Sequence, residues 1–290
     1  MSTIKIENKI IGDNQPTFVI AEIGINHNGN MENVFKLIDL AKDTGCDAVK
    51  FQKRTPELAV PKDQWHIKKD TPWGSIDYID YKNKIELSVN QYKQIDLYCK
   101  KTDIIWFTSC WDEKAVDDIA SVNALCFKIA SASLTDFTTI HKMLSYDVPI
   151  IMSTGMSTMD EIEKSVDIFG DKTIGLLQAT SAYPCEYEEL NLKMINTLNK
   201  RFSQHVIGYS GHESGLVTTA VAVAYGAKII ERHITLDRAM WGTDQAASLG
   251  PNGLRTLVSH IRTVEKSLGD GIKKVYESEK PIREKLRRVN

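Results

Sequence analysis

Residues 17–23 read TFVIAEI and form the first of eight short apolar segments that recur along the chain. Each segment is rich in Ile, Val or Phe and lacks regular polar alternation, which is typical of strands that are covered on both faces. Longer amphipathic stretches, such as residues 31–44 and 91–102, separate the segments. The other seven segments are residues 47–51 (DAVKF), 104–108 (IIWFT), 125–130 (LCFKIA), 149–153 (PIIMS), 173–178 (TIGLLQ), 206–210 (VIGYS) and 227–234 (AKIIERHI).

This alternation predicts the class of fold, because strands that alternate with helices form a parallel sheet. Eight such units within about 230 residues favour a closed (β/α)8 TIM barrel, an α/β fold, over an open doubly wound sheet. A length of 290 residues and a hydrophobic fraction of 42% are sufficient for one large core. No linker, repeat or low-complexity tract divides the sequence, so we expect a single domain over residues 1–290.

Three segments lie outside the regular alternation. Residues 1–16 predict an N-terminal β-hairpin that closes the bottom of the barrel, and residues 280–290 form a charged tail after a last helix over Pro251–Leu268. A long insertion, residues 54–88, follows the second strand and contains Trp65 and Trp73. In a TIM barrel this insertion lies at the carboxyl ends of the strands, where it would either cover a pocket as a lid or remain a surface excursion.

The composition excludes several classes of function. Lys and Arg number 36 against 38 Asp and Glu, for a net charge of −2, so the chain lacks the basic character of a nucleic-acid-binding domain. No apolar run approaches the roughly 20 residues of a membrane helix, and the N-terminus lacks the pattern of a signal peptide. The five cysteines are odd in number and widely spaced, which is typical of a reducing compartment. We therefore expect a soluble cytoplasmic protein with no nucleic-acid or membrane partner.

Polar residues follow nearly every predicted strand, and in a TIM barrel the carboxyl ends of the strands carry the chemistry. Lys50 and Lys128 lie inside apolar segments, where a lysine is rarely buried without a partner. Together with the hydroxyls of Thr108, Ser131, Ser153 and Ser210 they would bind a phosphate and a carboxylate. The alternative is that each lysine extends past the strand to solvent.

Two histidines and two carboxylates are further candidates. His212 and His233 follow adjacent strands and would share a divalent metal with open positions for substrate, or serve as hydrogen-bonded core residues. Glu22 ends an apolar strand, which suggests a general acid/base with a raised pKa or an ion-pair partner of Lys50. Asp244 lies in the loop after the last strand, where it would reach the mouth of the pocket or act as an ordinary turn residue.

Several short motifs follow one another in a fixed order: residues 21–29 (AEIGINHNG), 50–52 (KFQ), 128–131 (KIAS), 153–156 (STGM), 180–184 (TSAYP), 208–213 (GYSGHE), 231–237 (ERHITLD) and 247–249 (ASL). In this order they resemble the sialic acid (N-acetylneuraminate) synthase family, from about residue 18 to residue 271. Members of that family are (β/α)8 barrels that condense phosphoenolpyruvate with an aldose, typically N-acetylmannosamine or a relative. The product is a 3-deoxy-2-ulosonic acid.

The resemblance implies a role for each strand-end residue. His212 and His233 match ligands of a divalent ion, expected to be Mn2+, with Mg2+ or Co2+ as alternatives. Glu22, Lys50, Lys128 and Asp244 match positions that act in catalysis. Substrate-binding positions are matched by Gln52, Thr108, Ser131, Ser133, Ser153, Ser181, Tyr183 and Ser210, of which Gln52 and Tyr183 lie with Asp244 on the sugar side. The implied partners are phosphoenolpyruvate, a small sugar and further copies of the chain in a dimer or tetramer.

Two departures from the family pattern concern the sugar. Ser133 stands where members usually have a carboxylate that contacts the acceptor. The sequence ends at Asn290, near the position where members commonly continue into an antifreeze-like domain. We therefore expect a metal-dependent synthase whose acceptor can differ from N-acetylmannosamine. The alternatives are an octulosonate-type synthase that uses a pentose or a sugar phosphate, and a catalytically silent paralogue that binds sugar or phosphoenolpyruvate.

Overall fold

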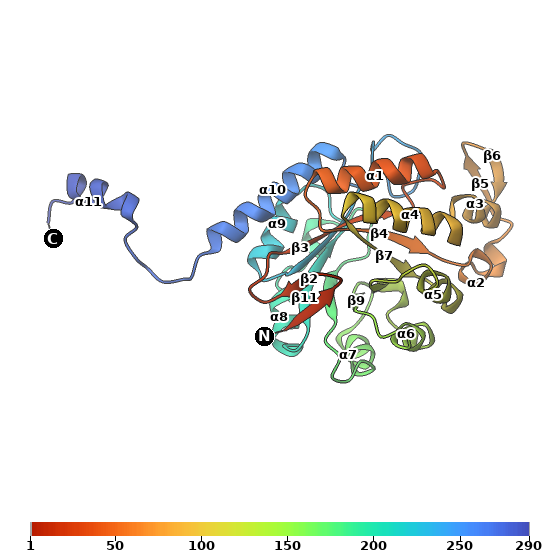
Figure 1. Cartoon of the computed structure of the whole chain (residues 1–290), viewed down its shortest axis with the longest axis horizontal. Coiled ribbons are helices and arrows are strands. Elements are labelled where there is room, and N and C mark those ends of the chain that lie inside the picture. The colour runs from red at the N-terminus through yellow and green to blue at the C-terminus, as the bar shows by residue number, and fades with distance from the viewer. Residues whose placement is uncertain (1, 290) are drawn as a thin grey trace.

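Eight parallel strands close into a barrel in the computed structural model, which describes residues 2–289 (Figure 1). The first strand, β3, pairs with both its successor and the last strand, so the sheet has no free edge. The predicted (β/α)8 barrel is therefore confirmed, and each strand lies within a few residues of its predicted segment. The strands are β3 (Phe18–Gly24), β4 (Ala48–Lys53), β7 (Ile105–Cys110), β8 (Phe127–Ile129), β9 (Ile150–Ser153), β10 (Gly175–Ala179), β11 (Val206–Gly211) and β12 (Ile229–His233).

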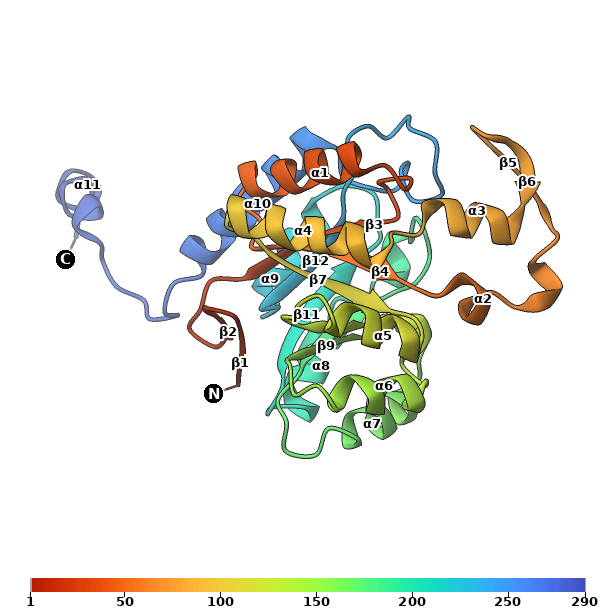
Figure 2. The same ribbon diagram turned by 45° about the vertical axis from the view of Figure 1, so that its right-hand side comes forward.

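Helices surround the barrel, and several of them begin at a residue whose side chain caps the helix. The Asn30 side chain accepts a hydrogen bond from the second residue of α1, and Ser88 and Thr158 form capping boxes at the starts of α4 and α7. Figures 1 and 2 show α1 and α4 side by side on the outside of the sheet. The helices are α1 (Met31–Asp43), α4 (Val89–Thr102), α5 (Glu113–Ala120), α6 (Phe137–Leu144), α7 (Met159–Asp167), α8 (Met194–Arg201), α9 (Val217–Ala224) and α10 (Pro251–Leu268).

Alternation along each strand separates two apolar layers. On β3, Val19 and Ala21 face the helices in the larger core cluster, whereas Phe18 and Ile20 face the barrel interior in the smaller one. The next interior position along this strand is Glu22. The same two-residue period, counted from Ala48, Cys126, Ile151 and Val206 of the interior cluster, places Lys50, Lys128, Ser153 and Ser210 inside the barrel, at the carboxyl ends of their strands.

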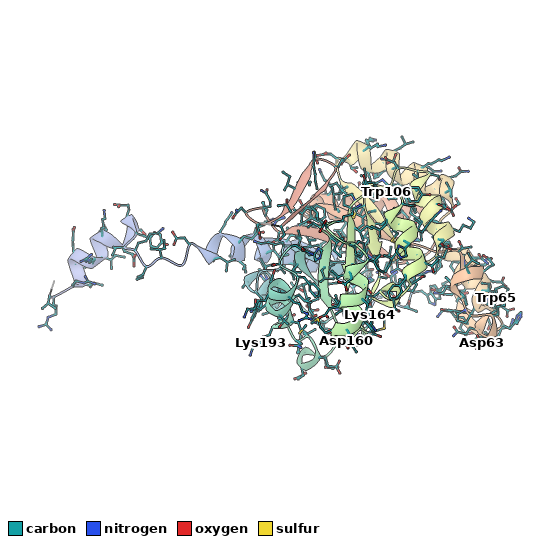
Figure 3. All side chains as sticks on the ribbon, turned by 90° about the horizontal axis from the view of Figure 1, so that it is seen from below. Asp63, Trp65, Trp106, Asp160, Lys164 and Lys193 are labelled. Carbon is teal, nitrogen blue, oxygen red and sulfur yellow. The ribbon has the colours of Figure 1, made fainter. Side chains whose placement is uncertain are left out.

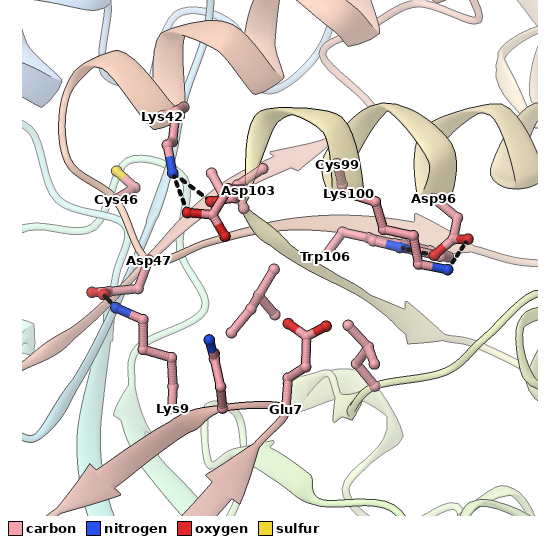
Figure 4. Close-up of a pocket in the computed structure, with 14 residues that line it drawn as sticks. Glu7, Lys9, Lys42, Cys46, Asp47, Asp96, Cys99, Lys100, Asp103 and Trp106 are labelled. Atoms are coloured by element: carbon pink, nitrogen blue, oxygen red, sulfur yellow. Dashed lines mark hydrogen bonds and ion pairs between the residues drawn. The ribbon is translucent and has the colours of Figure 1, made fainter.

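The N-terminal hairpin, β1 (Thr3–Ile6) and β2 (Lys9–Gly12), packs Ile4, Ile6 and Ile11 against the interior cluster, as expected for a segment that closes the bottom of the barrel. A cavity of about 400 Å³ lies beside it, and Figure 4 shows the charged side chains that line it. Three ion pairs neutralise most of these side chains: Lys9–Asp47 at 3.3 Å, Lys42–Asp103 at 3.2 Å and Lys100–Asp96 at 2.7 Å.

The insertion after β4 contains α2 (Pro56–Ala59), the short helix Lys62–Gln64, the hairpin β5 (Lys68–Thr71) and β6 (Gly74–Asp77), and α3 (Tyr78–Ile85). It projects from the barrel at the end away from the C-terminus, as Asp63 and Trp65 show in Figure 3. The rings of Trp73 and Tyr81 contact Trp241, with centroids 5.8 and 5.5 Å apart. Trp241 belongs to the loop after β12, so the insertion packs on a loop at the carboxyl ends of the strands.

The C-terminal segment extends away from the barrel after α10 (Figures 1 and 2). It includes the short helix α11 (Lys280–Leu286), so the predicted charged tail is partly helical. Along residues 2–289, none of the helices combines the length and the hydropathy needed to cross a membrane.

Candidate active site

A pocket of about 170 Å³ opens at the carboxyl ends of the barrel strands. Every one of the eight strands, or the loop directly after it, supplies at least one residue to the lining, as expected for the catalytic face of a TIM barrel. The lining residues are Glu22, Lys50, Gln52, Ser109, Trp111, Lys128, Ala130, Ser131, Ala132, Ser153, Met156, Ser181, Tyr183, Ser210, His212, Glu231 and His233.

The two lysines are buried at the floor of this pocket. Lys50 donates a hydrogen bond to the Ser109 hydroxyl at 2.8 Å and forms an ion pair with Glu22 at 3.0 Å. Lys128 donates to the Ser153 hydroxyl at 2.5 Å. Their exposed fractions are 4% and 1%, so the alternative in which these lysines reach solvent is wrong.

Glu231 lies between the two lysines, and the sequence analysis did not include it among the site residues. Its Oε1 atom is 3.7 Å from Lys50 Nζ and 3.9 Å from Lys128 Nζ, and it accepts a hydrogen bond from Ser210 at 3.1 Å. Burial alone would raise the pKa of this carboxyl, but the two lysines outweigh burial and lower it to about 2. Glu231 is therefore an anion that shares the charge of both lysines. An acidic residue inside an apolar strand is the same signal that identified Lys50, and it could have identified Glu231.

The pKa of Glu22 is shifted in the opposite direction from that of Glu231. Burial raises its pKa to about 7, although the Lys50 charge and a hydrogen bond from Gln52 at 3.0 Å act against this shift. A carboxyl with this pKa gains or loses a proton near neutral pH, which is what a general acid/base requires. The ion pair with Lys50 is also present, so both expectations for Glu22 agree with the geometry.

His212 and His233 lie next to each other, with ring centroids 5.8 Å apart. Burial lowers the pKa of His212 to about 4 and lowers that of His233, so both rings are neutral and suited to bind a metal. His212 Nδ1 lies 2.6 Å from the Thr180 carbonyl oxygen, which fixes the proton on that nitrogen and leaves Nε2 as an acceptor, 3.0 Å from the Tyr183 hydroxyl. His233 Nδ1 is buried and has no hydrogen-bond partner among the described residues.

These observations fit a divalent ion held by two histidines. In the part of the chain that the structure describes, no group of three or more His, Cys, Asp or Glu residues is arranged to hold a metal. With two histidines as its protein ligands, an ion at this position would keep open coordination sites for water or substrate, as catalytic metals do.

An ion pair on the outer side of the barrel supports both histidines. Arg232 Nη1 lies 3.1 Å from Glu213 Oε1, and Glu213 also accepts hydrogen bonds from Tyr209, Thr218 and Thr219. Glu213 follows His212 directly, and Arg232 precedes His233. This buried pair fixes the backbone beside each ring without contacting the pocket.

Gly155 brings a backbone amide to the edge of the pocket. Its N–H donates to the Ser131 hydroxyl at 3.1 Å. A Cβ atom at this position would lie 2.2 Å from Ser181 Oγ and 2.8 Å from Ser131 Oγ, so only glycine allows the two hydroxyls to approach. The Ser181 hydroxyl is buried without a hydrogen-bond partner among the described residues, which leaves it available to a ligand.

Thr108 does not line the pocket, and this prediction is wrong. On β7, Ile105 and Phe107 face the barrel interior, so Thr108 faces the helices, where its hydroxyl lies 3.2 Å from Cys110 Sγ. The next residue, Ser109, occupies the interior position and contacts Lys50. Side chains alternate along a strand, so an error of one residue places the side chain on the opposite face.

Ser133 and Asp244 also lie outside the lining. Ser133 is buried in a short 3-10 helix, Ser131–Ser133, of which only the first two residues line the pocket, so its predicted contact with substrate is not found. The Asp244 carboxylate accepts a hydrogen bond from Thr243 at 2.7 Å. Burial lowers the pKa of His233 and raises that of Tyr183, and the charge of Asp244 acts upward on both, so Asp244 lies near these two pocket residues.

A barrel with buried lysines, carboxylates and neutral histidines at the carboxyl ends of its strands has the architecture of an enzyme that acts on small anionic molecules. The sequence comparison gives the particular family. The model of the NeuB family matches residues 37–273, and the chain belongs to this family.

Relatives and solved structures agree with this assignment. The chain is 37% identical over 281 residues to the N-acetylneuraminate-9-phosphate synthase of Homo sapiens, covering 95% of this chain and 78% of that protein. It is 37% identical over 272 residues to the N,N'-diacetyllegionaminic acid synthase of Campylobacter jejuni, covering 91% and 80%. The crystal structure of an N-acetylneuraminic acid synthetase from Leptospira borgpetersenii, in complex with citrate, superimposes with a TM-score of 0.87 at 30% identity and covers 99% of this chain and 98% of that one. The predicted resemblance to sialic acid synthases is thereby confirmed.

Proposed function

We propose that this protein condenses phosphoenolpyruvate with an aldose, N-acetylmannosamine or a related sugar, to give a 3-deoxy-2-ulosonic acid and phosphate. The observation that carries the proposal is the polarity of the pocket. Two buried lysines and several hydroxyls form one side, while two neutral histidines and a carboxyl of raised pKa form the other. An anion and an aldehyde would therefore meet between these two sides, in a chain whose relatives are named as sialic and legionaminic acid synthases.

The anion cradle, defined as Lys50, Lys128, Ser109 and Ser153, would bind the phosphate and carboxylate of phosphoenolpyruvate. The two lysines share the low-pKa carboxylate of Glu231, and the second carboxyl beside Lys50, that of Glu22, has a pKa of about 7, so the cradle would take up further negative charge. Cations fixed in a buried site stabilise charge more effectively than they would in water.

The acceptor side would supply the proton transfers. Carbon 3 of phosphoenolpyruvate attacks the aldehyde carbon, water adds at carbon 2, and phosphate leaves with the bridging oxygen. Glu22 is placed to give a proton to the new hydroxyl group and to recover one from the added water, which its pKa near 7 permits. Gln52 donates a hydrogen bond to Glu22 and would hold it beside the acceptor. A divalent ion held by His212 and His233 would polarise the aldehyde as a Lewis acid.

The experiment that tests this proposal is phosphate release from phosphoenolpyruvate in the presence of Mn2+ and a panel of aldoses, with EDTA as control. The panel contains N-acetylmannosamine, its 6-phosphate, mannose, 2,4-diacetamido-hexoses and arabinose 5-phosphate. Release that depends on a sugar and is lost with EDTA is the expected result. Binding of phosphoenolpyruvate without release for any sugar would contradict the proposal and favour a silent paralogue, whereas release with arabinose 5-phosphate alone would favour an octulosonate-type synthase.

Gly155→Ala is expected to weaken phosphoenolpyruvate binding about tenfold, because the new methyl group displaces the Ser131 and Ser181 hydroxyls from the pocket. Isothermal titration calorimetry would measure the dissociation constant. Gly253→Ala is the matched control, because a Cβ atom there meets no heavy atom closer than 3.8 Å. Equal affinities of the Gly155→Ala variant and the wild type would show that these hydroxyls do not contribute to phosphoenolpyruvate binding.

Phosphoenolpyruvate affinity is expected to fall above about pH 8. Burial lowers the pKa of Lys128 to about 8, with Glu231 acting against the shift, so this cation loses its proton as the pH rises through 8. The dissociation constant should then increase about tenfold per pH unit well above 8, because binding requires uptake of one proton. In Lys128→Arg the guanidinium remains charged, and the dependence should disappear. A dissociation constant for the wild type that stays constant between about pH 7.5 and 9.5 would count against a role for the charge of Lys128.

A further inference from the structure

The insertion after β4 carries cations that lack carboxylate partners. Arg54, Lys69 and Lys82 form no ion pair with any described residue, whereas their neighbours Lys53 and Lys68 pair with Glu86 at 3.0 Å and with Asp77. We call Arg54, Lys69 and Lys82 the cationic cluster.

Aromatic rings hold the cationic cluster in place. The Arg54 guanidinium lies 4.3 Å from the ring centroid of Trp111, and Lys69 Nζ lies 4.9 Å from that of Tyr81. Lys82 Nζ is 5.4 Å from the same Tyr81 ring. Tyr81 packs in turn on Trp241 of the loop after β12. The cations are thus fixed by ring faces, which attract them without neutralising their charge.

Contacts connect the cationic cluster to the sugar side of the pocket. Arg54 donates a hydrogen bond to Gln52 Oε1 at 2.5 Å, and the amide of Gln52 donates to Glu22 at 3.0 Å. Gln52 and Trp111 both line the pocket. The cationic cluster therefore adjoins the part of the pocket in which the acceptor sugar would bind.

Two donors at this boundary have no acceptor. Arg54 is 7% exposed, and its Nε atom is buried without a hydrogen-bond partner among the described residues, as is the indole nitrogen of Trp111. Buried donors are nearly always satisfied in folded proteins, so a pair of unsatisfied donors beside a pocket indicates the place of a ligand acceptor.

The cations that act on Lys82 outweigh the carboxylates that act on it. Two carboxylates act on Lys82: Glu86, which already pairs with Lys53, and Asp244. Burial lowers the pKa of Lys82 to about 8. The charge of Arg54 also lowers this pKa, and its effect is larger than the opposite effect of Asp244. Of these two carboxylates, only Asp244 is not already paired with another lysine. An additional anion would therefore be stabilised beside the three cations.

From this juxtaposition we infer that the acceptor carries a phosphate monoester at the end remote from its aldehyde, and that Arg54, Lys69 and Lys82 bind this phosphate. The inference rests on the proposed function and narrows its acceptor to a sugar phosphate. The names of the relatives leave the choice open, since one product is a 9-phosphate and the other is not. A guanidinium and two ammonium groups complement the charge of a phosphate dianion, whereas a neutral sugar would leave these cations uncompensated.

The test compares kcat/KM for N-acetylmannosamine 6-phosphate and N-acetylmannosamine in the full chain. The wild type is expected to favour the phosphorylated sugar at least tenfold. Lys82→Gln and Lys69→Gln should each lower kcat/KM for the phosphorylated sugar about tenfold and change that for the neutral sugar less than twofold. Lys62→Gln, an exposed lysine of the same insertion, is the matched control and should change neither value.

Failure of the inference is distinguishable from failure of the proposed function. Turnover that favours the neutral sugar, or variants that affect both sugars equally, would overturn the phosphate subsite and leave the synthase intact. If neither sugar is turned over, calorimetry in the presence of phosphoenolpyruvate decides. Tighter binding of the 6-phosphate that is lost in Lys82→Gln would support the subsite, and equal or absent binding of the two sugars would overturn it.

Discussion

Lys128→Met is expected to lower the affinity for phosphoenolpyruvate about 100-fold or more. The substitution preserves most of the side-chain volume but removes a buried cation from the anion cradle. Loss of one partner from a desolvated charge contact costs about 2–5 kcal/mol, which corresponds to roughly 30-fold to several thousand-fold in affinity. Glu231 keeps its second lysine, Lys50 at 3.7 Å, so the fold is expected to tolerate the change.

Calorimetric titration of phosphoenolpyruvate and a thermal unfolding scan would separate binding from stability. Lys164→Met provides the control, because Lys164 is exposed on α7, on the outer surface of the barrel (Figure 3). A loss of affinity smaller than threefold in a folded Lys128→Met variant would show that the two buried lysines do not form the anion site.

His233→Asn is expected to abolish tight binding of Mn2+ and to reduce turnover about 1000-fold. Removing one of two protein ligands leaves the ion with a single histidine, and a Lewis acid that polarises a carbonyl is worth several kcal/mol of transition-state stabilisation. Equilibrium dialysis with Mn2+ would measure the stoichiometry independently of turnover. His141→Asn, on the exposed side of α6, serves as the control. Retention of one Mn2+ per chain with unchanged affinity would contradict the assignment of His233 as a ligand.

The fold could be predicted from the sequence because its determinants are local. Residues 17–23 and the seven related segments are apolar on both faces, and such strands occur where helices cover a parallel sheet. The boundaries of α10, Pro251–Leu268, agree with the prediction because proline begins the helix and Gly269 follows its end.

The candidate site could be predicted only as far as single residues stand out from their surroundings. Lys50 and Lys128 are conspicuous charges in apolar strands, and both lie in the pocket. Thr108 and Ser109 are adjacent hydroxyl-bearing residues, and only the alternation that begins at Ile105 distinguishes the inner from the outer side chain. Applying the two-residue period to β7 would have selected Ser109.

Glu231 could have been singled out as a carboxylate inside an apolar strand, but its role between the two lysines depends on three strands at once. It lies between Lys50 of β4 and Lys128 of β8, and these distances arise only when the barrel closes. The cationic cluster has the same origin, since Lys69 and Lys82 are distant in sequence from the loop that bears Trp241. Tertiary proximity of this kind has no periodic signal in the sequence.

The central claim is the formation of a carbon–carbon bond between phosphoenolpyruvate and an aldose, and its most direct test is carbon-13 NMR with phosphoenolpyruvate labelled at carbon 3. The account predicts that the vinyl signal is replaced by that of a methylene carbon bonded to the former aldehyde carbon of the sugar, in amounts equal to the phosphate released. Conversion of the label to the methyl group of pyruvate would reveal hydrolysis without condensation. That result, or an unchanged vinyl signal with every sugar of the panel, would contradict the proposed function.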